Sequence, residues 1–291
     1  MRALAVLVAV TAVWGVTFVQ VKDAVAIYPL FAFLALRFAI AACTLAVPGA
    51  ARLRSLGRTG LGAGALAGSL LGAGFLLQTA GLERTTVSST GFVTGMYVVL
   101  TPLIGFALFR SRVTRPVWAG VALTTIGLAL LSGIHAGSAA GDLLVLAGAA
   151  VYALQIVLME RFAPRYDALA FTLVEMLAAF AGLVLAAVAL GQLSMPHGST
   201  VWAALLVTGI FASAFAFLAQ TWAQRRASAT QTALAFSLEP VWTAFFGFTL
   251  AGDRLGTVGW LGCGVIMAGI ALAEPAAART LGRLVRRPRT A

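Results

Sequence analysis

The stretch "ATQTALAFSLEPVWTAFFGFTL", residues 229–250, is a run of 22 mostly apolar or small residues that carries a single charge, Glu239. As an α-helix rising 1.5 Å per residue it would be ~33 Å long, enough to cross the ~30 Å hydrocarbon core of a bilayer. A transmembrane β-strand would instead alternate apolar and polar residues over about ten positions. No such alternation is present, so the stretch predicts a transmembrane helix.

The rest of the chain has the same character. Of its 291 residues, 61% are hydrophobic and only 10% are charged, too few charges to cover the surface of a soluble protein of this length. We predict an all-α polytopic membrane protein with ten transmembrane helices and short loops. The predicted spans are residues 3–21, 29–48, 60–82, 87–109, 115–133, 141–159, 168–190, 201–223, 229–250 and 256–273.

The cations orient these spans. Of the 20 Lys and Arg residues, 16 lie at the termini and in alternate connections, whereas the other connections hold only Lys22, Arg84 and Arg254. The positive-inside rule then places both termini in the cytoplasm, with an uncleaved first helix. We expect the basic tail, residues 276–291, to be attracted to anionic membrane lipid, and we expect no nucleic-acid partner because no folded reader accompanies the tail.

An internal duplication is visible at an offset of 142 residues, where "FLLQT" (75–79) returns as "FLAQT" (217–221). The same offset aligns Arg84 with Arg226 and Trp118 with Trp260. We predict two five-helix repeats, residues 1–135 and 141–275. An odd number of helices in each repeat gives the two halves opposite orientations, and inverted repeats are typical of secondary transporters.

Glu239 lies about eleven residues into its span, ~16 Å deep and near the bilayer centre. A charged side chain at this depth costs free energy, so its presence suggests a functional role. A layer of polar and aromatic side chains at similar depth is typical of a small-molecule site. The predicted substrate-binding residues are Trp14, Thr94, Tyr97, Tyr152, Gln155, Glu239 and Trp242. Two roles remain open for Glu239: a structural one beside Pro240, or a functional one in which it exchanges a proton or binds a substrate amine.

Other intramembrane polar residues have separate expected roles. Gln78 and Gln220 are expected near opposite faces of the membrane, which suits gating. Arg37 and Glu175 are expected to be structural charges, as an ion pair or by snorkelling. Arg37 could instead pair with Glu239, since both lie at similar depth, and the proton role would then fail. Glycines at 60, 64, 68 and 72 form one ridge of their helix, which predicts close helix packing.

An enzyme is not expected. The sequence contains no H-E-x-x-H or G-x-S-x-G motif and no His/Asp cluster, so we predict neither a metal nor a cofactor. A pump driven by ATP would need a nucleotide-binding domain, for which the ten spans leave no room. A secondary carrier of a small-molecule substrate remains, and a membrane protein without transport activity is a remote alternative.

Several segments resemble the drug/metabolite transporter superfamily, specifically its ten-helix EamA-type members. They are "WGVTFV" (14–19), "LRFAIAA" (36–42), "LTPLIGFALF" (100–109), "SLEPVWTAFFGFTLAGDRL" (237–255) and "GWLGCGVIMAGIAL" (259–272). The resemblance implies a carrier of the bacterial inner membrane that exports amino acids or other small metabolites. Uptake or facilitated exchange is the alternative. The sequence departs from the family at "LFRSRVTR", which lacks the acidic residue that often follows the fourth helix.

Overall fold

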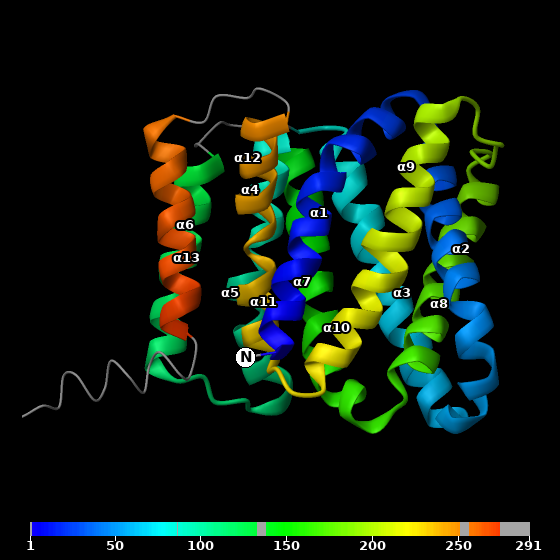
Figure 1. The fold of residues 1–291 in the computed structure, drawn as a ribbon, viewed down its shortest axis with the longest axis horizontal. Helices are drawn as coiled ribbons and strands as arrows, with labels where there is room; N and C mark the ends of the chain where they lie inside the picture. Colours follow the sequence, from blue (N-terminus) through cyan, green and yellow to red (C-terminus); the bar gives the residue numbers. More distant parts are fainter. Residues whose placement is uncertain (1, 86, 133–137, 251–255, 274–291) are drawn as a thin grey trace, which may run out of the picture.

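The computed structural model describes residues 2–85, 87–132, 138–250 and 256–273, and these residues contain helices and no strand. The helices stand side by side, and the chain passes back and forth between the two ends of the bundle (Figure 1). The predicted all-α polytopic fold is confirmed.

Grouped in chain order, the described helices form ten spans, seven of them a single helix and three of them interrupted. The single-helix spans are α1 (Arg2–Ile27), α2 (Leu30–Gly49), α3 (Gly57–Leu82), α6 (Arg115–Ser132), α7 (Ala139–Phe162), α8 (Ala168–Ala189) and α13 (Thr257–Ala273). The interrupted spans are α4 (Val87–Gly95) with α5 (Tyr97–Phe109), α9 (Ser199–Gly209) with η3 (Ile210–Phe215) and α10 (Ala216–Gln224), and α11 (Ala229–Phe236) with α12 (Glu239–Leu250). Short 3-10 turns η1 (Ala50–Leu56) and η2 (Ala163–Arg165) connect neighbouring spans.

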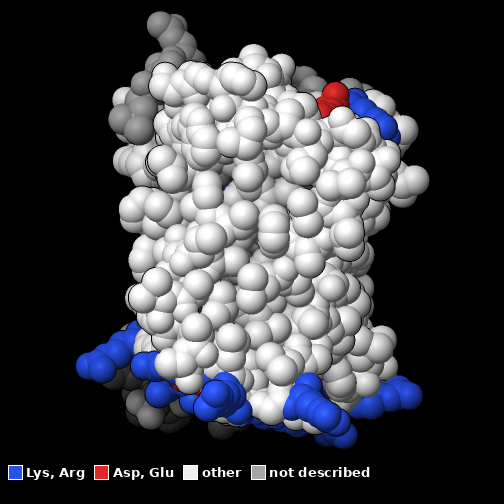
Figure 2. All heavy atoms as spheres, turned by 90° about the vertical axis from the view of Figure 1, so that its right-hand side faces the viewer, with Lys and Arg blue, Asp and Glu red and all other residues white. Residues whose placement is uncertain are grey.

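The outer surface is that of a membrane protein. Figure 2 shows a broad band without charged side chains, and Lys and Arg gather at the lower end of the view. Five segments of the described residues are long and apolar enough to cross a membrane by length and composition alone. One of these, Leu30–Leu82, contains both α2 and α3. Large apolar side chains such as Leu143 and Leu185 are about two-thirds exposed, as expected of side chains that face lipid.

Two of the interruptions fall at equivalent positions of the two halves. The break in the fourth span is at Met96 and the break in the ninth is at Ser237–Leu238, so the 142-residue offset pairs Met96 with Leu238. Pro240 explains the second break, because its ring lacks an N–H and clashes with the carbonyl group four residues earlier. The first break follows Gly95, and glycine has the weakest helix preference after proline. Tyr97 and Glu239 are therefore the first residues of α5 and α12.

The eighth span is interrupted differently. Its middle six residues, Ile210–Phe215, form a π-helical segment, η3. Such wider turns are rare and often occur at functional sites. The close approach of α2 at this level depends on Gly209, since a Cβ there would lie 3.0 Å from the carbonyl oxygen of Arg37.

Glycine ridges bring two helix pairs into backbone contact. Along α3, a Cβ on Gly64 would meet the Val174 side chain at 2.9 Å, and a Cβ on Gly68 would meet the Glu175 carbonyl oxygen at 2.1 Å. Along α6, a Cβ on Gly120 would lie 2.5 Å from the carbonyl oxygen of Gly269 in α13. Close helix packing, predicted from the glycine spacing of residues 60–72, is confirmed.

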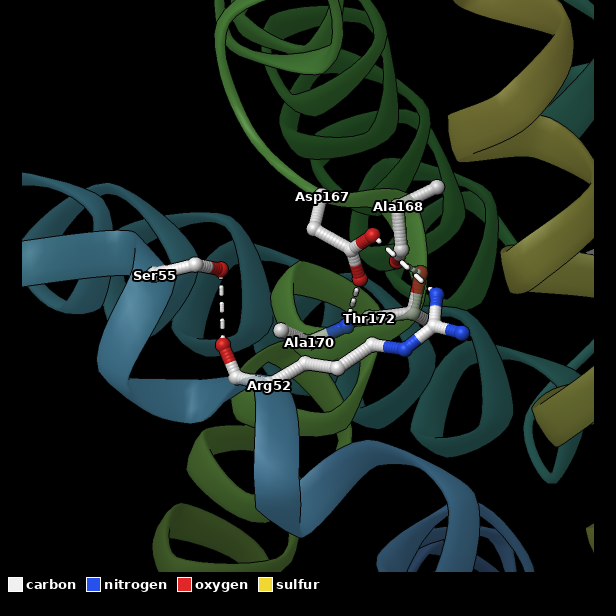
Figure 3. Close-up of polar contacts among 6 residues, drawn as sticks. All are labelled: Arg52, Ser55, Asp167, Ala168, Ala170 and Thr172. Atoms are coloured by element: carbon white, nitrogen blue, oxygen red, sulfur yellow. Dashed lines mark hydrogen bonds and ion pairs between the residues drawn. The ribbon is translucent and has the colours of Figure 1, made fainter.

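A polar contact fixes the start of α8 at the arginine-rich end. Asp167 is the N-cap residue, and its Oδ1 accepts a hydrogen bond from the Ala170 N–H at 3.0 Å (Figure 3). Its Oδ2 lies 3.3 Å from Nη1 of Arg52 in η1. The Ser55 hydroxyl donates to the Arg52 carbonyl at 2.7 Å and completes the turn of η1. This end of the bundle is therefore held by a helix cap and an exposed ion pair, which together contribute about 1–2 kcal/mol.

Of three buried apolar clusters among the described residues, the two largest make up most of the interior. One is built around α2, α8 and α9 and includes Phe33, Phe38 and Leu205. The other is built around α5, α6, α7 and α11 and includes Val98 and Leu128. Trp14 of α1 packs against both clusters. The central cavity lies along this boundary, where elements of both halves meet.

Candidate functional site

A cavity of about 100 Å³ lies in the middle of the bundle and has room for several water molecules or a small solute. Its walls come from α1, α2, α3, α4, α5, α7, α10, α11 and α12. Nine of the eleven residues singled out from the sequence line it, namely Trp14, Arg37, Gln78, Thr94, Tyr97, Tyr152, Gln155, Gln220 and Glu239. Six of these nine are among the predicted substrate-binding residues, whereas Arg37, Gln78 and Gln220 were assigned other roles from the sequence.

The two helix breaks present Tyr97 and Glu239 to this cavity from opposite halves. Discontinuous helices near the bilayer centre are typical of transporter binding sites, because broken helices offer polar groups where a continuous helix would not. The Glu239 carboxylate has no hydrogen bond or ion pair within the described part of the chain. Its side chain is therefore open to a partner in the cavity.

Trp242 does not line the cavity, in contrast to the sequence prediction. Its ring stacks on the Phe246 ring, with 5.9 Å between the ring centroids. A Cβ placed on Gly15 of α1 would lie only 2.6 Å from the Cβ of Trp242. The residue lies one turn beyond Glu239, at the expected depth, but on the face of α12 that packs against α1. We correct its expected role from substrate contact to helix packing.

Gln78 and Gln220 also differ from expectation, because both line the same cavity instead of lying near opposite faces. Gln78 Nε2 donates to the Thr94 hydroxyl at 3.0 Å, and its Oε1 accepts from the Tyr152 hydroxyl at 3.1 Å. These bonds tie α3 to α4 and to α7. Gln78 therefore orients two other cavity residues.

Gln220 belongs to a second polar chain. It donates to Gln155 Oε1 at 3.1 Å and to Gln224 Oε1 at 2.8 Å. Gln155 in turn donates to Glu175 Oε1 at 2.7 Å. Within the described residues, Gln220 Oε1 and Glu175 Oε2 are buried without a hydrogen-bond partner. The chain of amides links the cavity to the buried Glu175 carboxyl, which does not itself line the cavity.

Arg37 does not form the expected ion pair with Glu175. Its Nε donates to the Ser213 hydroxyl at 2.8 Å and its Nη2 to the Ala212 carbonyl at 3.4 Å, both in the π-helical segment. The guanidinium carbon lies 4.6 Å from the centre of the Phe75 ring, within cation–π range. The only ion pair among the described residues is Arg52–Asp167, so Arg37 also lies more than 4.0 Å from the carboxylate oxygens of Glu239.

The sequence analysis identified Trp14 but missed the phenylalanines of the aromatic wall, Phe75, Phe217 and Phe236. Phe75 and Phe217 line the cavity, and the Trp14 ring lies 5.7 Å from Phe217 and 4.8 Å from Phe236. A signal was present, because Phe75 and Phe217 open the duplicated "FLLQT" and "FLAQT" segments. Ser213 was missed too, and the sequence gives no sign of the π-helical turn that carries it.

Comparison with known proteins gives a consistent result. The sequence model of the EamA-like transporter family matches twice, over residues 1–133 and 139–273. A protein of Archaeoglobus fulgidus described as an uncharacterized transporter is 29% identical over 260 residues, which cover 89% of this chain and 81% of the relative. A solved crystal structure at 21% identity superimposes with a TM-score of 0.81 over 96% of this chain and 99% of its own, which supports the fold alone. Since the family matches cover nearly all of the sequence, the chain belongs to the EamA-like transporter family and is a multi-pass membrane transporter.

Proposed function

We propose that this protein is a secondary active transporter that carries small metabolites by alternating access. The observation that carries the proposal is the central cavity, where Tyr97 and Glu239 begin the second halves of two broken helices. Charged, amide and aromatic side chains converge there inside an apolar bundle, which is the arrangement a small polar substrate requires. Membership of a transporter family argues against an enzyme.

The proposed architecture is a pair of inverted repeats. The family model matches each half separately, and the helix breaks at Met96 and Leu238 recur at the 142-residue offset. Because five spans precede α7, that helix runs opposite to α1. The two repeats, residues 1–135 and 141–275, could therefore rock against each other around the cavity. The proposed tail, residues 276–291, lies outside the described residues.

Within this proposal, export of amino acids or related compounds is the favoured direction, and uptake or facilitated exchange is the alternative. Glu239 binds the amine of the substrate or exchanges a proton during the cycle. Flux into and out of proteoliposomes against a panel of labelled metabolites tests the proposal. Counterflow of at least one compound is the expected result, and no flux of any compound in either direction would contradict it.

The proposed location is the bacterial inner membrane with both termini in the cytoplasm. Cysteines introduced singly at Ser55 and Met195, in a variant free of Cys43 and Cys263, test this orientation in intact cells. Both positions are exposed, and they lie at opposite ends of the bundle. A membrane-impermeant thiol reagent should label position 195 and leave position 55 unlabelled until the cells are opened. Labelling of position 55 in intact cells would invert or refute the topology.

Tyr97→Ala is expected to reduce transport far more than protein abundance. Tyr97 is 5% exposed and lines the cavity, so truncation removes a ring from the site. We expect the initial flux to fall about tenfold, equivalent to about 1.4 kcal/mol. Leu103→Ala on the same helix is the matched control, since Leu103 is 47% exposed and faces away from the cavity. Equal losses in the two variants would indicate that Tyr97 has no role in the site.

A further inference from the structure

Arg37 is a buried cation that forms no ion pair with a carboxylate in the described part of the protein. Its side chain is 5% exposed in the middle of α2, and no carboxylate oxygen in the described residues lies within 4.0 Å of it. A guanidinium stays charged at neutral pH, and a charge inside a membrane protein is normally paired. The partners it does have, a hydroxyl, a carbonyl and a phenyl ring, are all neutral.

The π-helical segment fixes the orientation of this guanidinium. Ser213 and Ala212 accept two of its five N–H groups, on Nε and Nη2. Trp14 Nε1 donates to the same Ala212 carbonyl at 2.8 Å, so the segment positions two cavity residues at once. Among the described residues, Nη1 donates no hydrogen bond. Since Arg37 lines the cavity, unused donors remain for a ligand there.

Glu239 supplies the opposite charge on another wall of the same cavity without pairing with Arg37. Two opposite charges that face one cavity inside a membrane protein without forming an ion pair are costly in the empty site. A ligand that bears both an anionic and a cationic group would neutralise both. The planar fork of a guanidinium matches the two oxygens of a carboxylate.

We infer that Arg37 is the subsite for a carboxylate on the transported molecule, held ready by Ser213 and the Ala212 carbonyl. This inference rests on the transport function proposed above and says why the transporter would select substrates that carry a carboxylate. The substrate then carries a carboxylate that binds Arg37, and a cationic group on it binds Glu239. The aromatic wall of Phe75, Phe217 and Trp14 lies against the apolar remainder of the molecule.

The test compares matched ligands with and without the carboxylate. Alanine, leucine and phenylalanine are each paired with their amides, which keep the amine but lose the carboxylate. Binding to the purified full-length chain is measured by ligand-dependent thermal stabilisation. For at least one pair, the wild type should bind the amino acid about tenfold or more tightly than the amide, because a charge-assisted bidentate contact is lost. In Arg37→Gln this ratio should fall to about one, and Arg37→Lys should give an intermediate ratio.

Three control variants separate the roles. Arg226→Gln, which removes an exposed arginine stacked on Trp222 at 5.6 Å, should keep the wild-type ratio. Glu239→Gln should weaken the binding of the amino acid and of its amide equally, so the ratio of their affinities should stay unchanged. Ser213→Ala retains the Arg37 charge and loses only its anchor, so it should lower the ratio several-fold even if the Arg37 variants do not fold.

Two results would overturn the inference. One is a carboxylate preference that persists in Arg37→Gln, or in Ser213→Ala when the Arg37 variants do not fold. The other is a wild type that shows no such preference in any pair. If the wild type carries another metabolite of the flux panel while showing no preference, the transport function stands and only the carboxylate subsite fails. Absence of flux for every compound contradicts the transport function itself.

Discussion

Replacing Gly68 by alanine is expected to destabilise the protein by about 1–3 kcal/mol or more, a large part of the stability of a typical domain. The added methyl group would lie 2.1 Å from the carbonyl oxygen of Glu175 and 2.9 Å from the Cβ of Ala178. The first of these atoms is part of the α8 backbone, and the second is bonded directly to it. No side chain can therefore rotate away, and α3 and α8 must separate along their contact.

Gly62→Ala is the matched control on the same helix. No atom lies within 4 Å of a Cβ at Gly62, and alanine favours a helix by about 1 kcal/mol over glycine. This variant should be as stable as the wild type or slightly more so. Melting temperature and monodispersity of the purified protein measure both changes. Equal melting temperatures for the two variants would show that α3 and α8 do not pack as described.

The sequence alone predicts only in part that Gly68→Ala is more destabilising than Gly62→Ala. The spacing of glycines at 60, 64, 68 and 72 predicts a ridge that packs against another helix. It does not say which helix, because spacing along one element contains no information about its neighbour. Gly62 lies off the ridge, and the structure shows open space there.

The depth of the cavity residues in the membrane was predictable, because it follows from counting residues along each span. At 1.5 Å per residue, the distance from a span end placed Trp14, Tyr97, Tyr152 and Glu239 at one level, and all four line the cavity. Counting says nothing about the direction in which a side chain points around its helix axis. Trp242 lies at nearly the right depth and faces α1, and Arg37 turns to the π-helical segment instead of to Glu175.

The helix breaks were predictable at only one of their two sites. Pro240 marks the break before Glu239, since proline removes a backbone hydrogen bond. The break at Met96 has no proline beside it, and Pro102 lies further along, inside α5. Only the 142-residue offset, which aligns Met96 with Leu238, relates the two sites.

Glu239→Gln is expected to reduce proton-driven flux about a hundredfold, equivalent to about 2.7 kcal/mol. Glutamine has nearly the size of glutamate and keeps a hydrogen-bonding oxygen, so the cavity and the start of α12 should be preserved. It cannot hold a negative charge or exchange a proton. No cation lies within 4.0 Å of the Glu239 carboxylate among the described residues, so we expect a proton or the substrate to neutralise it during the cycle. Glutamine removes both possibilities, whereas Glu239→Asp should retain part of the activity.

The matched control for this change is Glu83→Gln. Glu83 is exposed at the end of α3, so its replacement makes the same chemical change outside the cavity. Flux, melting temperature and abundance of this variant should all equal those of the wild type. A loss of flux in Glu83→Gln as large as in Glu239→Gln would show that any lost carboxylate impairs the protein.

The most direct measurement is flux of a transported metabolite in proteoliposomes at several pH values, with and without a pH gradient, for wild type and Glu239→Gln. We predict that a pH gradient drives uphill flux by the wild type. In Glu239→Gln the gradient should drive none, while exchange of substrate for substrate partly persists. If Glu239→Gln transports at the wild-type rate with the wild-type pH profile, then Glu239 is structural and the account of this cavity is wrong.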